Sequence, residues 1–129
     1  MHEYGHVLLE DETQVDLTVG RDTHDPAGFV EGAFRRAFYD AFWRELGVSG
    51  AGDYDRSPTH YVSRYGANYF HEDIADTFAI FVLGGELGKN TVAEEKLRFF
   101  WRDPDMTALR SAVRENLGLE WPKRAAHGC

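Results

Sequence analysis

The sequence predicts a mainly α-helical fold. Several segments repeat apolar residues at the spacing of one helix face, and Gly, Pro, Thr and Asp stand where such helices would begin or end. Strict alternation of apolar and polar residues, which is typical of strands, covers only residues 15–19. With 129 residues and 43% hydrophobic content, the chain can bury one core but is too short for two ordinary domains. We expect one domain over residues 1–122 and a disordered tail over residues 123–129.

Two helices and a short strand are expected in the first part of the chain. A helix from His2 to about Leu9 precedes the alternating stretch at 15–19, which predicts a strand. The strongest amphipathic helix runs from about Gly28 to Leu46 and ends before Gly47. Its predicted apolar stripe consists of Val30, Phe34, Ala37, Phe38, Ala41 and Phe42, and Arg35, Arg36, Asp40 and Glu45 lie largely elsewhere.

Four helices are expected in the rest of the chain. One runs from about Pro58 to Gly66, and the next covers residues 71–83 and stops at Gly84-Gly85. A capping-box pattern opens a helix from Thr91 to about Trp101, and an Asp-Pro pair opens the last helix, from residue 104 to about 117. The predicted buried faces are Ile74, Phe78, Phe81 and Val82 in the second of these helices, and Met106, Leu109, Val113 and Leu117 in the last.

The most informative pattern in the chain is HExxH, at residues 2–6. On a helix, residues four apart lie on the same face, so the imidazoles of His2 and His6 can bind one Zn²⁺ at about 2.0–2.1 Å. Glu3 then lies close to the metal without binding it, where its carboxylate can take a proton from a water that the metal acidifies. The pattern therefore indicates metal-assisted hydrolysis, most often of a peptide bond.

Two considerations bear on this interpretation. So short a pattern also arises by chance, and the alternative is a surface helix start with two unliganded His and an exposed Glu. Gly5 favours a functional helix weakly, because Gly costs about 1 kcal/mol relative to Ala in a helix. A glycine at this position is better explained by the close approach of another backbone than by a solvent-exposed helix surface.

A second acidic pattern offers the third ligand of the expected zinc site. Glu72 and Asp76 stand four residues apart in the predicted helix 71–83 and share a face. A catalytic zinc takes three protein ligands and keeps one open position, and the set of His2, His6 and Glu72 meets this requirement. Asp76 can accept the second ring N–H of a ligand His. The alternative is that both acids only stabilise the first turn of the helix through its dipole.

Residues 65–78 resemble the active-site region of gluzincin metallopeptidases of the anthrax lethal factor type, with a Tyr seven residues before the ligand Glu and an acid four residues after it. The chain is also similar to a group of bacterial secreted or lipoprotein zinc metallopeptidases. Residues 91–100 look like the tail of that group, so the likeness extends over about residues 2–117. The sequence departs from the group at residues 68–70, where Asn-Tyr-Phe replaces Thr-Asn-Pro.

The resemblance implies the helical part of a zincin catalytic domain that binds zinc through the three side chains named above. It also implies that Glu3 is the general base and that Tyr65 donates a hydrogen bond to the tetrahedral oxyanion. Tyr65 is equally open to a place in an aromatic core. His71, directly beside the proposed ligand, is an alternative ligand. The Asp and His residues of loop 20–26 are a weaker metal-site candidate and more often cap a turn.

The start of the chain departs from the zincin pattern. The strands that form the substrate-binding edge of zincins precede the zinc-binding helix, whereas only Met1 precedes His2 here. We therefore expect a carboxy-terminal fragment that lacks the upstream sheet, with His2 poorly held in a fraying first turn. The resemblance implies a secreted or cell-envelope protein, although the letters contain no signal peptide. The single Cys129 excludes an internal disulfide.

Composition restricts the partners of the chain. A formal net charge of −8 argues against nucleic acid and anionic membrane surfaces, because both attract basic patches. No apolar run approaches the roughly 18 residues of a membrane span. The expected partners are Zn²⁺ and a peptide or protein substrate, and the sequence does not determine the oligomeric state. Two alternatives to a peptidase stay open: a zinc-binding module without activity, and a helical interaction domain without metal.

Overall fold

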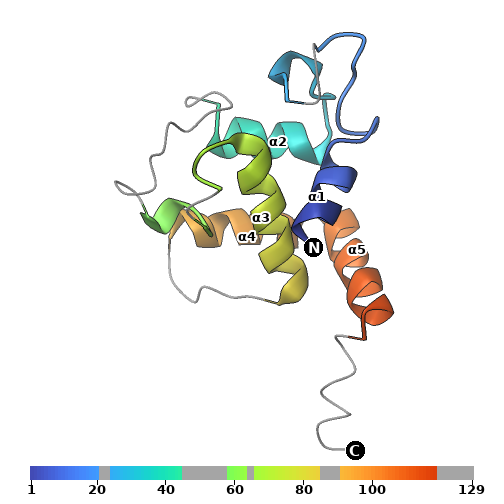
Figure 1. Cartoon of the computed structure of the whole chain (residues 1–129), viewed down its shortest axis with the longest axis vertical. Coiled ribbons are helices and arrows are strands. Elements are labelled where there is room, and N and C mark those ends of the chain that lie inside the picture. Colours follow the sequence, from blue (N-terminus) through green and yellow to red (C-terminus); the bar gives the residue numbers. More distant parts are fainter. Residues whose placement is uncertain (21–23, 45–57, 64–65, 85–90, 119–129) are drawn as a thin grey trace, which may run out of the picture.

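The computed structural model of the chain is mainly helical, which confirms the predicted fold class (Figure 1). It describes residues 1–20, 24–44, 58–63, 66–84 and 91–118; Tyr65 and the predicted tail at 123–129 lie outside these ranges. No helix within the described ranges combines the length and the apolar character needed to cross a membrane. The α-helices are α1 (His2–Leu9), α2 (Phe34–Phe42), α3 (Phe70–Leu83), α4 (Val92–Arg102) and α5 (Pro104–Asn116).

Helix α3 is the centre of the fold. It contacts each of the other four α-helices, and Figure 1 shows it crossing the middle of the molecule between them. It begins after Tyr69 and ends at Gly84, whose φ of 86° is a left-handed conformation that glycine adopts without strain. The stop at Gly84 was predicted from the sequence. So was the buried face, which consists of Ile74, Phe78, Phe81 and Val82, none more than 1% exposed.

Aromatic rings fill the space between α3 and the two helices α2 and α4. The ring centroids of Phe34 and Phe100 are 4.5 Å apart, those of Phe81 and Phe100 5.2 Å, and those of Phe38 and Phe70 6.1 Å. Ring pairs at such distances contribute about 0.5–1.5 kcal/mol each beyond the area that they bury. The aromatic core therefore fixes the position of α3, including its first turns, which carry the acidic residues.

Helix α2 is shorter than predicted. It begins at Phe34 because the preceding residues Pro26–Gly28 form a separate 3₁₀ turn, η1, and because Gly32 has a φ of 82°, outside the α-helical region. Ala37 and Ala41, which were predicted in the apolar stripe, are exposed. The stripe prediction was wrong at these positions because the larger rings of the helix occupy the core.

A buried arginine also contradicts the predicted face of α2. Arg35 was predicted to lie off the apolar stripe with the other charged residues, yet the structure leaves none of it exposed. Its guanidinium lies over the rings of Phe29 and Phe70, 4.7 and 4.9 Å from their centroids, and donates a 3.0 Å hydrogen bond to the carbonyl of Leu9. Burial lowers the pKa of Arg35 to about 10, so the side chain stays charged at neutral pH. Arg35 thus holds the end of α1 with a cation, where the helix dipole favours one.

The strand predicted at residues 15–19 does not form. Val15 makes only an isolated antiparallel bridge with Phe29, and Leu17 and Val19 are exposed. The carboxylate of Asp16 accepts hydrogen bonds from the amide of the residue two further on at 2.9 Å and from its hydroxyl at 2.6 Å. Such a local side-chain bond favours a turn over an extended strand. The alternation of apolar and polar residues was therefore misleading here.

The helix predicted at residues 58–66 is reduced to a single 3₁₀ turn, η3 (Pro58–His60). The backbone groups that would continue a helix have side-chain partners instead. The carbonyl of His60 accepts a 2.7 Å hydrogen bond from Nζ of Lys96, and the amide of Gly66 donates a 2.9 Å bond to Oγ of Ser63. In the described residues 61–63 and 66–69, before α3, the predicted helix is therefore not formed; Tyr65 lies outside them.

The last two helices begin where the sequence predicts. Thr91 Oγ1 caps α4 by accepting a 3.1 Å hydrogen bond from an amide of the first turn, and Asp103 Oδ1 caps α5 with two such bonds at 2.9 and 3.1 Å. Met106 and Val113 are buried, as predicted. Leu117 is 55% exposed, contrary to prediction, because α5 ends before it.

A buried ion pair joins α3 to α4. Asp73 Oδ2 lies 2.8 Å from Nζ of Lys96 and accepts a 2.7 Å hydrogen bond from the indole of Trp43. Neither charged side chain is more than 2% exposed. Burial raises the pKa of Asp73 and lowers the pKa of Lys96, and the attraction between the two charges opposes both shifts. Each charge is therefore tolerated in the interior only because the other is present.

We expect Lys96→Met to lower the free energy of unfolding by about 3–5 kcal/mol, because it leaves the carboxylate of Asp73 buried without its cation. Adding Asp73→Asn should recover part of the loss, since a neutral amide costs less to bury. Urea denaturation measures both changes. The matched control is Arg98→Met on the same helix, whose 3.9 Å pair with Glu94 is partly exposed and whose loss should change stability by less than about 1 kcal/mol. Equal losses in the free energy of unfolding for Lys96→Met and Arg98→Met would contradict this account.

Candidate metal centre

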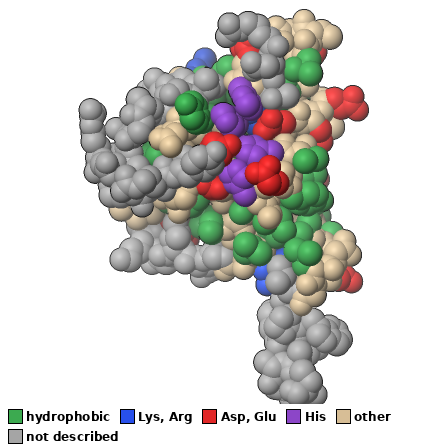
Figure 2. Space-filling model, in the orientation of Figure 1, with side chains coloured by type: hydrophobic (Ala, Val, Ile, Leu, Met, Phe, Trp, Pro, Cys, Tyr) green, Lys and Arg blue, Asp and Glu red, His purple; other side chains and the backbone are tan. Residues whose placement is uncertain are grey.

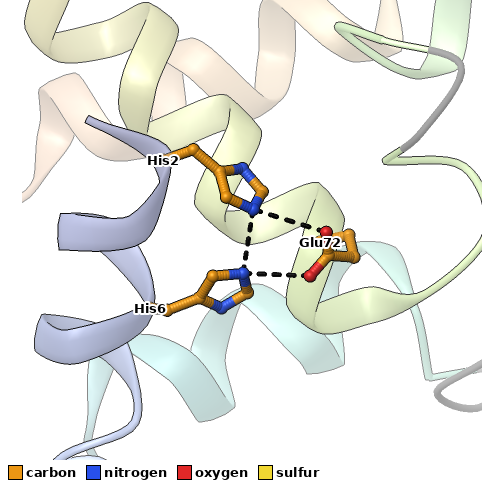
Figure 3. A group of neighbouring side chains, drawn as sticks. All are labelled: His2, His6 and Glu72. Atoms are coloured by element: carbon orange, nitrogen blue, oxygen red, sulfur yellow. Dashed lines mark hydrogen bonds and ion pairs between the residues drawn. The ribbon is translucent and has the colours of Figure 1, made fainter.

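Helix α1 packs directly against α3, and a glycine sets the distance between them. A Cβ atom on Gly5 would lie 3.3 Å from the Cα atom of Ala75 and 3.0 Å from Cδ2 of Phe78. The close approach of a second backbone is the reason for glycine that the sequence indicated. With α1 seated in this way, the side chains of His2 and His6 face the first two turns of α3 (Figure 3).

The structure brings His2, His6 and Glu72 together (Figure 3). Nε2 of His6 lies 2.9 Å from Nε2 of His2 and 2.9 Å from Oε1 of Glu72, and Nε2 of His2 lies 3.3 Å from Oε2 of Glu72. One ligand atom from each residue lies within 4.8 Å of the others. In the described part of the chain, no other set of three or more His, Cys, Asp or Glu side chains meets the same condition.

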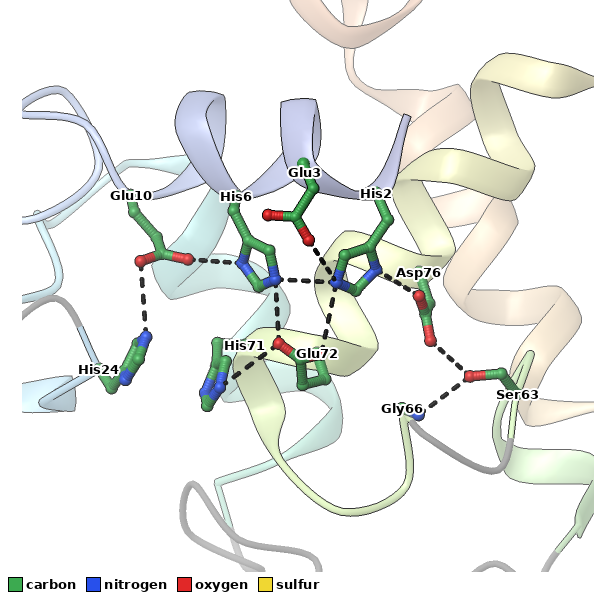
Figure 4. A network of polar contacts seen from close by, with 10 residues as sticks. All are labelled: His2, Glu3, His6, Glu10, His24, Ser63, Gly66, His71, Glu72 and Asp76. Atoms are coloured by element: carbon green, nitrogen blue, oxygen red, sulfur yellow. Dashed lines mark hydrogen bonds and ion pairs between the residues drawn. The ribbon is translucent and has the colours of Figure 1, made fainter.

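Each histidine ring has a carboxylate at its other nitrogen (Figure 4). Nδ1 of His2 contacts Oδ1 of Asp76, the residue predicted for this role, and Nδ1 of His6 lies 2.6 Å from Oε2 of Glu10. A carboxylate accepts a hydrogen bond from the N–H group that it contacts, which places a ring hydrogen on Nδ1 of both histidines. The Nε2 atoms of the two rings face one another, and a neutral ring carries its lone pair at that atom.

This arrangement suits a bound cation. Two imidazole nitrogens and a carboxylate at these distances are stabilised by a positive charge between them, which a proton on one Nε2 or a bound metal ion supplies. Oε2 of Glu72 is buried and has no hydrogen-bond partner among the described residues, which leaves an uncompensated acceptor in the cluster. Two atoms bound tetrahedrally to zinc at 2.0–2.1 Å are about 3.3 Å apart, so the observed separations fit with shifts of a few tenths of an ångström. Two imidazoles and a carboxylate also form a common donor set for catalytic zinc.

The proposed general base lies at the solvent side of this cluster. The side chain of Glu3 is 91% exposed, and its Oε1 is 3.9 Å from Nε2 of His2. Because Glu3 follows His2 on the same turn, its carboxylate can reach the metal side of the ring without competing with Glu72 for the buried position. A water between Glu3 and the cluster would be open to the outside.

Two further histidine rings, those of His24 and His71, stack on each other beside the cluster of His2, His6 and Glu72. The ring of His71 lies parallel to that of His24 at 3.8 Å between centroids, and the ring of Tyr69 lies 5.4 Å away on a similar plane. Nε2 of His71 is 3.5 Å from Oε1 of Glu72, but His71 does not belong to the grouped ligand atoms. Burial first, and then the neighbouring ring of His24, lower the pKa of His71 to about 4, so it is neutral at neutral pH. His71 therefore flanks the cluster.

Two other candidates from the sequence have different outcomes. In loop 20–26, Asp25 caps the 3₁₀ turn η1 by accepting a 3.0 Å hydrogen bond from the amide of Ala27, which is the capping role that the sequence left open. Asp22 and Tyr65 lie outside the described residues. The role of Tyr65 at an oxyanion therefore stays a prediction from the resemblance.

Sequence reasoning missed two polar residues next to the cluster. Glu10 contacts His6 from four residues further along the chain, and this spacing after the second His was a signal that could have identified it. Ser63 donates a hydrogen bond to Oδ2 of Asp76 across 13 residues, and no local pattern predicts such a contact. Figure 2 shows that histidine and acidic side chains gather on one face of the molecule around this point.

No family model matches the chain, and neither a curated protein nor a solved structure is similar to it. The resemblance to gluzincin peptidases therefore stays a prediction from the sequence motifs. The chemistry of the cluster has to be inferred from the side chains that form it.

We expect Gly5→Val to destabilise the protein by about 1–3 kcal/mol, because the added side chain overpacks the contact between α1 and α3. The backbone of α3 at Ala75 cannot move aside without disturbing the core. Urea denaturation measures the change. Val7→Ala, in the same helix at a position 67% exposed, is the control and should alter stability by no more than about 0.5 kcal/mol. A Gly5→Val protein as stable as the wild type would refute the close contact.

Proposed function

We propose that this mainly helical chain acts in a zinc-dependent peptidase that hydrolyses peptide bonds with Glu3 as general base. The proposed ligands of Zn²⁺ are His2, His6 and Glu72. Support comes from the HExxH pattern, from the resemblance of residues 65–78 to gluzincin active sites, and above all from the geometry of the cluster.

The observation that carries the proposal is that the Nε2 atoms of two histidines and the carboxylate of Glu72 lie close together. The Nδ1 atom of each histidine is already in contact with another carboxylate. Asp76 and Glu10 occupy the Nδ1 atoms of the two rings, so both Nε2 atoms are left as electron-pair donors 2.9 Å apart. Carboxylates in this position raise the basicity of a ligating imidazole and fix its direction. A surface helix with two unliganded histidines has no need of either acid.

In the proposed reaction, each residue of the cluster has a separate task. Zinc, when bound, acidifies water and polarises a carbonyl group. Glu72 offsets part of the positive charge, and Asp76 and Glu10 keep the rings aligned. Glu3 accepts a proton from the attacking water and then gives it to the leaving amine. Its 91% exposure leaves room for a peptide to approach. Tyr65 is proposed, from the resemblance, as a hydrogen-bond donor to the oxyanion.

The charge of the chain favours a class of substrate. With a net charge of −8 and acidic side chains gathered around the histidines (Figure 2), the chain attracts cationic peptides at long range. This attraction acts on the rate of encounter and weakens as ionic strength rises. A neutral or cationic peptide is therefore the better first substrate for an assay.

We expect the protein to bind one Zn²⁺ per chain. Removing a ligand by His6→Ala should weaken binding by more than the roughly 10–100-fold that outer partners contribute. Competition with a chromogenic chelator measures the affinity, and elemental analysis the stoichiometry. The control is His60→Ala, because His60 is exposed and lies outside the grouped ligand atoms. A wild-type protein without stoichiometric zinc would leave the helical interaction domain as the better account.

Glu3→Gln should retain zinc but lose peptide hydrolysis by several orders of magnitude, because the amide cannot accept the proton of the attacking water. Mass spectrometry of a peptide mixture incubated with each protein measures the cleavage. Glu95→Gln, at an exposed position of α4, is the control for loss of a surface charge. Near-normal turnover by Glu3→Gln would reject the general-base role. Zinc binding by a wild-type protein that cleaves nothing would identify a binding module without activity.

A further inference from the structure

A chain of hydrogen bonds leads from His2 away from the proposed zinc site to the loop before α3 (Figure 4). Nδ1 of His2 contacts Oδ1 of Asp76, and Oδ2 of the same carboxylate accepts a hydrogen bond from the hydroxyl of Ser63. Oγ of Ser63 in turn accepts a 2.9 Å bond from the amide of Gly66. Four groups from three segments of the chain are thus connected in series.

The direction of every bond in this series is determined by chemistry. A backbone amide can only donate, so Oγ of Ser63 accepts from Gly66 and has its own proton left for Asp76. An ionised carboxylate can only accept, so Nδ1 of His2 must be the donor at its other oxygen. In the neutral form of His2 with its hydrogen on Nδ1, the lone pair lies at Nε2, toward Glu72. The hydrogen bonds from Gly66 through Ser63 and Asp76 therefore favour the Nδ1–H tautomer of His2, which is the one that can bind a metal ion through Nε2.

The outer end of the series is fixed to the same helix as the ligand. A Cβ atom on Gly66 would lie 3.2 Å from Cα of Asp73 and 3.3 Å from Oγ of Ser63, so a larger residue would crowd both α3 and the hydroxyl. Gly66 is buried, and its amide points at Ser63 from a position that α3 determines. Ser63 therefore has a defined orientation although it belongs to a loop.

We propose that Ser63 is a positioning residue of this site, which acts through Asp76 on the ring of His2. Where zinc is concerned, this inference rests on the function proposed above. The hydroxyl holds one oxygen of Asp76 so that the other faces Nδ1 of His2, and it thereby directs Nε2 of His2 toward the metal. Without the hydroxyl, the carboxylate of Asp76, which is 17% exposed, can turn toward water.

His2 needs such a tether more than His6 does. His2 is the first residue of α1, and no side chain caps that end of the helix. A first turn lacks intrahelical partners for its amides and frays readily. His6 lies one turn inside the helix, and its acidic partner Glu10 follows at the end of that helix. The series through Ser63 thus adds a link between His2 and α3 at the Nδ1 side of the ring.

Zinc affinity tests the proposal with three variants. Ser63→Ala should weaken zinc binding about tenfold, as loss of an outer hydrogen-bond partner does, while Ser63→Thr, which keeps a hydroxyl, should restore it. Ser111→Ala, the same change at an exposed position of α5, should have no effect. Ser63→Ala also takes the hydrogen-bond acceptor away from the buried amide of Gly66, so the urea midpoint of the metal-free protein should fall, and Ser63→Thr should restore it. Unchanged zinc affinity in Ser63→Ala would overturn the proposal.

A double-mutant cycle separates positioning from general structural damage. In an Asp76→Ala background, Ser63→Ala should cause no further loss of zinc affinity, because the residue through which it acts is gone. An equal loss in both backgrounds would mean that Ser63 acts independently of Asp76, and the proposal would be wrong.

The ring of His2 gives a readout that needs no metal. Long-range ¹⁵N–¹H NMR of the metal-free protein reports which nitrogen of a neutral imidazole carries the proton. We expect the Nδ1–H form of His2 in the wild type and in Ser63→Thr, and an increased share of the Nε2–H form in Ser63→Ala. A tautomer that does not respond to Ser63→Ala overturns the positioning role. A wild type that binds no zinc overturns the proposed function instead, and the NMR comparison still decides the role of Ser63.

Discussion

The contact between α1 and α3 at Gly5 is the constraint on which the candidate site depends. The two backbones approach so closely that a Cβ atom would be 3.3 Å from the Cα atom of Ala75. At this separation the rings on α1 reach the carboxylate of Glu72 on α3. Arg35 strengthens the same contact from the opposite end of α1, where it donates to the carbonyl of Leu9. The site therefore belongs to the packing of two helices and to neither helix alone.

Carboxylates take three different roles within a short distance of one another. Glu72 faces the two imidazoles, Asp76 and Glu10 hold those imidazoles from behind, and Asp73 points into the core toward Lys96. Burial and the identity of the partner decide the role, since the side chains themselves are chemically alike. Carboxylates gathered in this way are costly without cations nearby; Lys96 supplies one in the core, and the proposed metal ion would supply another at the imidazoles.

Those parts of the structure that depend on strong local signals could be predicted from the sequence. Gly84 stops α3 through its backbone conformation, Thr91 caps α4 through its hydroxyl, and both effects act within one turn. The burial of Arg35 could not be predicted, because it depends on rings and a carbonyl from other segments. The partnership of Ser63 with the acid of another segment was beyond prediction for the same reason. At the site, helical spacing indicated which side chains share a face, and tertiary packing determined which faces meet.

The adjacent acids Glu72 and Asp73 have a consequence for how α3 is aligned along its axis. Successive residues on a helix point about 100° apart, so one of the two carboxylates turns to the imidazoles while the other turns to the interior. A slip of α3 by a single residue would bring the wrong acid opposite Lys96 and leave a charge without its counterion. The salt bridge between Asp73 and Lys96 thus fixes the position of α3 along its axis, and with it the position of the Glu72 carboxylate opposite the ring of His6.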